Sequence, residues 1–150
     1  MLKKMIYLLI ICVFAAGSVY SAEKSTAGEA KKMVEMAAAY ITANGEEATI
    51  KEINKSDGKF VKGDLYVFAY DMNAVMKAHP IDPKLIGQKL YDKADSKGKL
   101  FRKEIVELAK SKGSGFVDYT YRNPATKAEE PKTTYIQKVG NLIVCCGAYK

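Results

Sequence analysis

Tryptophan is absent from this 150-residue chain, and histidine occurs once, as His79. A single histidine excludes a metal site built from several histidines. The spacing of the cysteines from His79 does not support a cysteine–histidine nucleophile pair. A glycine-rich phosphate loop is also missing, because the stretch GSG at residues 113–115 follows a helical pattern and ends it. These absences argue against catalysis, and we expect a protein that is not an enzyme and needs no cofactor.

Long apolar runs are confined to the first 22 residues. There, Lys3 and Lys4 precede the run MIYLLIICVFAAG, and small residues follow in SVYSA. This layout is typical of a secretory signal peptide, with an uncleaved N-terminal anchor as the alternative. We therefore expect a signal peptide over residues 1–22 and one exported domain over residues 23–150. The expected location is the periplasm, with full secretion as the alternative.

The formal net charge of the chain is +7, and Lys3 and Lys4 contribute two of these positive charges. The other lysines are scattered and do not form a dense run with interleaved aromatic residues. A solvated basic surface explains this pattern better than a nucleic-acid-binding surface. We expect no nucleic-acid partner.

Cysteines offer no disulfide scaffold in the expected mature domain, because only the adjacent pair Cys145 and Cys146 remains. Neighbouring residues in a strand point to opposite faces, which makes an ordinary disulfide between them geometrically poor. A strained disulfide between neighbours, with a redox role, stays open as an alternative. The preferred interpretation places one cysteine in the core and the other near the surface.

Hydrophobic periodicity predicts an α+β domain. The expected elements are helices over residues 27–44, 46–54 and 101–112, strands over 60–61, 65–71, 75–79, 116–122, 132–139 and 142–149, and a structured irregular connection over 80–99. Strand 65–71 carries apolar residues on both faces, which indicates cover on both sides. The predicted order is a long helix followed by an antiparallel sheet of about five strands with a helical crossover.

Aromatic residues recur at alternate positions of the predicted strands. They are Tyr66, Phe68 and Tyr70 on one strand, Tyr119 and Tyr121 on a later one, and Tyr135 on the next, which Lys132 opens. If these converge over one face with Lys132 and a protonatable His79, they form an apolar pocket with positive charge, suited to a carboxylate. The alternative is that the tyrosines simply pack well on a pleated surface and the histidine is structural.

The motifs NGEEATIKEIN, GKFVKGDLYVFAYDMN, AHP, LIGQKLYD, GSGFVDYTYRNP, KTTYIQKV and VCCGAYK occur in an order that resembles the single Cache domain, an extracytoplasmic sensor domain of bacterial chemoreceptors and sensor kinases. The resemblance covers about residues 27–150. It implies a PAS-like fold, with a long N-terminal helix on one face of the sheet. It also implies a ligand pocket on the other face, roofed by loops and short helices.

Relatives of this kind bind small carboxylates such as acetate, propionate, pyruvate or lactate. By position, the resemblance implies a ligand site formed by Tyr66, Phe68, His79, Tyr119, Tyr121 and Lys132. One departure is Tyr121, which stands where relatives often have tryptophan.

The sequence ends directly after the last predicted strand. We therefore expect the signal to pass through a partner, such as a membrane receptor, kinase or transporter. The alternative function is a ligand-free interaction or structural domain that forms a homodimer through its N-terminal helix.

Overall fold

The computed structural model describes residues 23–150; the expected signal peptide, residues 1–22, lies outside this part. The described chain begins with helix α1 (Ala27–Asn44), followed by α2 (Glu46–Ile53). Thr26 starts α1 with a reciprocal capping box: its side chain accepts from the backbone N–H of Glu29, and the Glu29 carboxylate accepts from the backbone N–H of Thr26. Gly45, at φ 85°, separates the two helices in a conformation that favours glycine.

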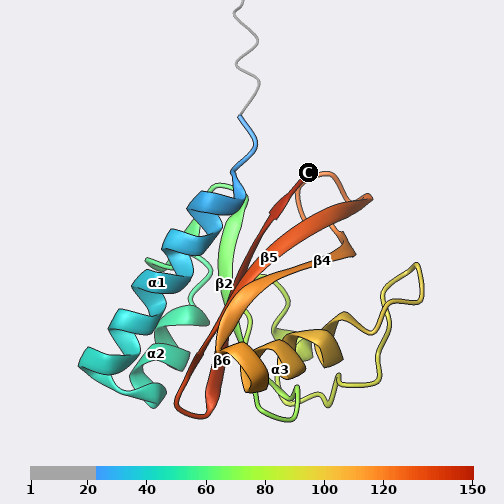
Figure 1. Cartoon of the computed structure of the whole chain (residues 1–150). Coiled ribbons are helices and arrows are strands. Elements are labelled where there is room, and N and C mark those ends of the chain that lie inside the picture. Colours follow the sequence, from blue (N-terminus) through green and yellow to red (C-terminus); the bar gives the residue numbers. More distant parts are fainter. Residues whose placement is uncertain (1–22) are drawn as a thin grey trace, which may run out of the picture.

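The sheet is antiparallel at every described pairing (Figure 1). Its strands are β1 (Val61–Lys62), β2 (Leu65–Asp71), β3 (Met76–Ala78), β4 (Ser114–Arg122), β5 (Glu129–Val139) and β6 (Leu142–Tyr149). Five of them lie in the order β1-β2-β6-β5-β4, and β3 pairs with β2. The predicted α+β class is confirmed, with six strands where about five were expected.

Strands β1 and β3 differ from the predicted ranges by one residue at each end, and β4 and β5 begin two and three residues earlier than predicted. Strand β5 begins at Glu129, because the chain stays extended through Pro131 and continues to pair with β4. Strand β4 begins at Ser114, so the stretch GSG is not a loop. Gly113 alone ends the preceding helix, in the left-handed conformation at φ 78°.

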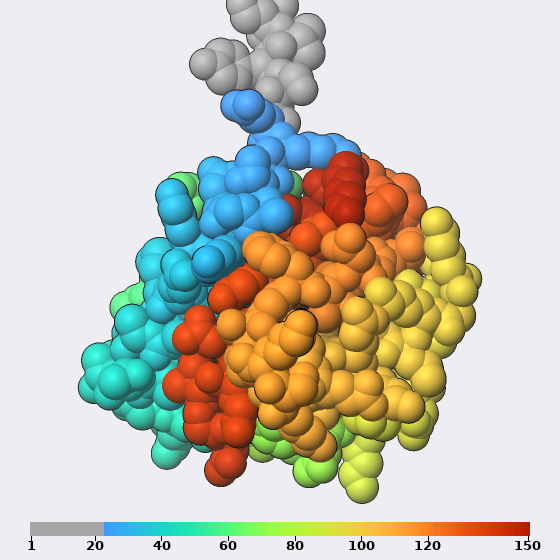
Figure 2. All heavy atoms as spheres, viewed as in Figure 1, coloured from blue at the N-terminus to red at the C-terminus, as the bar shows by residue number. Residues whose placement is uncertain are grey.

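The connection over residues 80–99 is irregular, as expected, apart from a short 3₁₀ helix, η1 (Pro83–Leu85). It is fastened to the chain around β3 by backbone hydrogen bonds from Met76 to Gln88 and from Leu90 to Ala74. Helix α3 (Phe101–Lys112) follows. In the space-filling view the yellow connection packs directly against the orange α3 region, so the two form one covering layer (Figure 2).

Two hydrophobic clusters occupy the two faces of the sheet. On one face, α1 packs through Ala30, Met33 and Val34 against alternate residues of the central strands, such as Val67 and Val144. We call this side the helix face. The other face, covered by α3 and the 80–99 connection, carries the aromatic residues and is called the pocket face. The prediction that β2 is covered on both sides is confirmed.

Cys145 and Cys146 are both fully buried and both free. Cys145 belongs to the pocket-face cluster and Cys146 to the helix-face cluster. The expectation that one of them lies near the surface is wrong, because β6 is a central strand with both faces covered. Within residues 23–150, no helix combines the length and apolar character needed to cross a bilayer.

Candidate functional site

Lys132 on β5 is buried, with 1% of its surface exposed. Its strand register places it opposite Tyr119 of β4 and Tyr149 of β6, on the pocket face. The side chain lies beside Gly147 of β6, where an added Cβ would approach the Cε atom of Lys132 to 2.5 Å. The absence of a side chain at Gly147 therefore leaves room for the methylene groups of Lys132 beside β6.

The ammonium group of Lys132 is surrounded by aromatic rings. Its Nζ atom lies 4.4 Å from the ring centroid of Tyr66, 4.8 Å from Tyr149, 5.4 Å from Phe68 and 5.5 Å from Tyr121. These distances are in the range of cation–π contacts. Nζ also donates a hydrogen bond of 3.0 Å to the hydroxyl of Tyr66.

No carboxylate pairs with this ammonium among residues 23–150; the ion pairs of that part involve other lysines, mostly exposed. A buried charge without an opposite charge is expensive to desolvate. The rings and one hydroxyl offset only a part of that cost. An anion beside the ammonium would offset the remainder.

His79 follows β3 and faces the same group of rings, with its centroid 5.2 Å from that of Tyr66. Its Nδ1 atom accepts hydrogen bonds from the backbone N–H groups of Asp82, at 2.9 Å, and Ile81, at 3.3 Å. Burial and the nearby Lys132 cation lower the pKa of His79 from 6.5 to about 4. The ring is therefore neutral at pH 7 with its proton on Nε2, and the expectation that it adds positive charge is wrong.

Tyr119 and Tyr121 reach the pocket face from β4. Tyr119 is stacked on Phe101 of α3, with ring centroids 3.9 Å apart and an angle of 7° between the ring planes. Its hydroxyl forms a hydrogen bond of 2.8 Å with the hydroxyl of Thr134. Burial raises the pKa of Tyr119 well above its usual value, so its hydroxyl stays protonated. Tyr121 packs edge-on against both rings and is only partly buried.

All six predicted site residues meet around one small cavity. Its lining is Tyr66, Phe68, Tyr70, Met76, His79, Phe101, Tyr119, Tyr121 and Lys132. The cavity volume is about 10 Å³, close to the room needed for one water molecule. The residues converge as predicted, but the space beside Lys132 does not accommodate an organic acid in this conformation.

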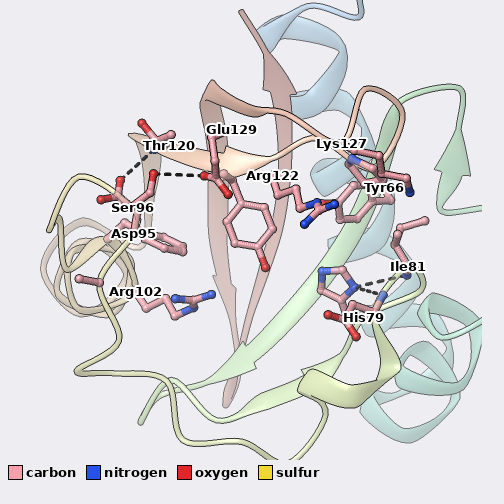
Figure 3. Close-up of a pocket in the computed structure, with 15 residues that line it drawn as sticks. Tyr66, His79, Ile81, Asp95, Ser96, Arg102, Thr120, Arg122, Lys127 and Glu129 are labelled. Carbon is pink, nitrogen blue, oxygen red and sulfur yellow. Dashed lines mark hydrogen bonds between the residues drawn. The ribbon is translucent and has the colours of Figure 1, made fainter.

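A second, larger cavity of about 480 Å³ lies outside the first (Figure 3). It is open to solvent between the loops around residues 79–82, 94–96 and 122–129 and the start of α3. Four residues line both cavities and form the wall between them: Tyr66, His79, Phe101 and Tyr121. We call the two spaces the inner and the outer cavity.

Arg102 is a site residue that the sequence interpretation missed. It extends into the outer cavity from the start of α3, opposite His79 (Figure 3), and is 6% exposed. A signal was available, because Arg102 falls at helical spacing with Ile105, Val106 and Ala109, which are buried. An arginine on the apolar side of an amphipathic helix is a candidate for a buried functional group.

Tyr135, considered with the other strand aromatics in the sequence but not among the six predicted site residues, does not join the site. It belongs to the helix-face cluster, where Lys31 of α1 lies over its ring. Tyr135 is three positions from Lys132, and strand side chains alternate, so the two must point to opposite faces.

Among the described residues, no group of three or more histidine, cysteine, aspartate or glutamate side chains could hold a metal ion. The polar groups that converge on the inner cavity are hydrogen-bond donors and one cation, Lys132. Such a set suits an anionic organic ligand.

The sequence model of the family described as single Cache domain 2 matches residues 2–149. The chain belongs to the single Cache domain family, whose members are extracytoplasmic or periplasmic sensor domains.

Solved structures agree with this assignment. A periplasmic sensor domain of a chemotaxis protein is similar at 27% identity and a TM-score of 0.65, covering 81% of this chain and 88% of its own. A Cache chemosensory domain, described by its recognition of carboxylic acids, is similar at 28% identity and 0.64, covering 81% and 86%. A methyl-accepting chemotaxis protein from Vibrio parahaemolyticus, at 23% identity and 0.71 over 81% and 86%, shares the fold.

A curated relative is the methyl-accepting chemotaxis protein McpP of Pseudomonas putida. It is 34% identical over 88 residues, which are 57% of this chain. The matched stretch is 16% of that receptor, so the chain spans only a small part of its relative's length.

Proposed function

We propose that residues 23–150 form an exported sensor domain, preceded by a signal peptide, that binds a small organic acid such as acetate, propionate, pyruvate or lactate. The observation that most supports this proposal is the Lys132 ammonium, which is buried among aromatic rings and has no carboxylate partner in the described chain. A ligand carboxylate would supply the missing charge. The solved relative that recognises carboxylic acids supports this proposal.

The bound carboxylate accepts hydrogen bonds from Lys132 Nζ, which has three donors and gives one to Tyr66. His79 adds its Nε2–H as a neutral donor. Phe68 and the stacked pair Phe101 and Tyr119 enclose the short apolar end of the acid. Charge-assisted hydrogen bonds in a dry site are strong, which gives this arrangement its affinity.

Binding requires the inner cavity to open, since about 10 Å³ is too small for the smallest of these acids. The wall towards the outer cavity is the place for this change, because Tyr121 is only partly buried. The ligand enters from the outer cavity, displaces this ring and merges the two spaces. We propose that this rearrangement passes a signal to a partner such as a membrane receptor, kinase or transporter.

Isothermal titration with acetate, propionate, pyruvate and lactate tests the proposal on the wild-type domain and on Lys132→Met. Removing one partner of a buried charged hydrogen bond costs about 2–5 kcal/mol, so affinity should fall at least about thirtyfold. Lys110→Met, at an exposed position of α3 that lines neither cavity, is the matched control and should bind like the wild type. Absence of heat with every acid, or unchanged affinity in Lys132→Met, would reject the proposal.

The second candidate function is a ligand-free domain that dimerises through α1. It is favoured by Met36, which is 53% exposed, and by the nearly filled inner cavity. Two other large apolar residues of α1 do not extend this exposed surface, because Met33 is buried and Tyr40 is half-buried. Light scattering coupled to gel filtration distinguishes a monomer from such a dimer.

A further inference from the structure

Arg102 is the second buried cation of the site, and the binding of a single carboxylate at Lys132 does not use it. Its Nε donates to the hydroxyl of Tyr70 at 3.2 Å, and its Nη1 donates to the backbone carbonyl of Lys93 at 3.3 Å. Both acceptors are neutral, and no ion pair of the described residues includes Arg102. A guanidinium carries five N–H donors in a fixed fork, so donors remain for a group in the outer cavity.

Three acidic residues line the outer cavity, and each accepts hydrogen bonds from other groups of the chain. Asp95 accepts from the backbone N–H groups of Lys97, Lys99 and Thr120 and holds the 94–99 turn against β4. Glu129 accepts from the hydroxyl of Ser96.

The third acid, Asp82, caps η1 by accepting from the backbone N–H of Lys84. Arg122 and Lys127 add two further cations to the lining. None of the three carboxylates forms an ion pair with Arg102.

The two buried cations lie on either side of one aromatic wall. The Tyr121 ring centroid is 5.5 Å from Lys132 Nζ and 5.9 Å from Arg102 Cζ. Phe101, in the same wall, has Arg102 Cζ 4.2 Å from its centroid. A short ligand that crosses the wall can therefore reach both cations and keep its hydrocarbon middle against aromatic rings.

We propose that the ligand carries a second anionic group, which binds Arg102 while the first carboxylate binds Lys132, so that the site selects short dicarboxylates over monocarboxylates of the same length. This inference rests on the proposed function and names the substrate class of the same site. Two carboxylates neutralise two buried cations, whereas a monocarboxylate leaves Arg102 without a counter-ion. Arg102 would form a bidentate pair with the distal carboxylate, a geometry that its planar fork favours.

Isothermal titration of the wild-type domain with succinate, butyrate and monomethyl succinate is the first test. The first two probes have equal carbon counts, and the ester removes one charge while keeping the chain of succinate. We expect succinate to bind at least tenfold more tightly than either of the others. Equal or tighter binding of butyrate overturns the inference.

Arg102→Met is the second test, with Lys110→Met, at an exposed position of the same helix that lines neither cavity, as the control. We expect the succinate-to-butyrate affinity ratio to fall to about one in Arg102→Met, with butyrate affinity little changed, and to stay at the wild-type value in the control. A retained ratio in a folded Arg102→Met variant assigns Arg102 a structural role and overturns the inference. Should this variant fail to fold, as judged by its thermal melt, the wild-type series with the ester decides alone.

Failure of this inference and failure of the proposed function give different results. Binding of monocarboxylates without a dicarboxylate preference rejects the role of Arg102 and leaves the proposed function in place. Absence of binding by acetate, propionate, pyruvate, lactate, butyrate and succinate alike rejects both.

Discussion

The two faces of one sheet differ less in how deeply they bury side chains than in what they bury. On the helix face, the cluster around α1 consists of aliphatic and aromatic residues and a cysteine. On the pocket face, the same strands enclose Lys132 and Thr134, and the covering elements add Arg102 and His79. Polar groups cost free energy to bury, and hydrocarbon would fill the same space more cheaply. The helix face therefore stabilises the domain, and we propose that the pocket face gives up stability for recognition.

The same substitution on the two faces is the sharpest way to separate these roles. Met33→Ala on the helix face and Met76→Ala on the pocket face each remove a buried methionine, and each should lower the free energy of unfolding by about 2–5 kcal/mol. Only Met76 lines the inner cavity, so only Met76→Ala should change carboxylate affinity. Urea unfolding and titration measure the two quantities. A change of affinity in Met33→Ala would break the division between the faces.

Acid should weaken the pocket face through His79. Its pKa is lowered to about 4 in the folded state, so below pH 6.5 the unfolded chain takes up a proton that the folded domain does not. Stability is therefore lost as the pH falls from 6.5 to 4, by up to about 3 kcal/mol. His79→Gln should remove this part of the pH dependence, measured as the difference between urea unfolding curves at pH 7 and pH 4.5. A wild-type pH dependence that survives the substitution would contradict the assignment.

Adding one carbon atom tests how tightly the pocket face is packed around Lys132. A Cβ at Gly147 would lie 2.2 Å from Thr134 Oγ1 and 2.5 Å from Lys132 Cε, so Gly147→Ala should cost about 1–3 kcal/mol of stability and weaken ligand binding by displacing the lysine. Gly28→Ala in α1 is the control. There the nearest atom is the Oγ1 of the N-cap residue Thr26, at 3.8 Å, and alanine favours the helix. Thermal melts and titration that show no difference between the two variants would refute this account.

The smallest expected effect concerns the outer surface of α1. Met36→Lys exchanges an exposed side chain and should change stability by less than about 0.5 kcal/mol. If the outer surface of α1 is a dimer contact, the same variant should lower the molar mass measured by light scattering. An unchanged monomer mass in both proteins limits α1 to its packing role.

Much of the architecture could be predicted because the spacing of apolar residues along the chain indicates helices and strands. The helices over residues 27–44 and 101–112 and the strands over 65–71 and 142–149 were predicted with the bounds that the structure shows. Alternation in Leu65–Asp71 was sufficient to separate the two faces of β2.

The chemistry of the site was harder to predict. Lys132 and the tyrosines converge as their strand positions suggested, but the charge of His79 depends on burial and on Lys132, neither of which a sequence displays. Arg102 was overlooked because arginine is usually exposed, and the small inner cavity depends on how the rings pack in three dimensions. Tyr135 was a different case, because counting by twos from Lys132 already excluded it.

The two adjacent thiols in β6 can report separately how the covering layers on the two faces of the sheet open. Cys145 is covered by the pocket-face cluster and Cys146 by the helix-face cluster. Burial raises the pKa of Cys146 to about 12 and that of Cys145 well above its usual value, so neither forms a reactive thiolate while covered. Alkylation rates at the two sulfur atoms, resolved by mass spectrometry, would report separately on the opening of each layer, from one peptide and without any engineered label.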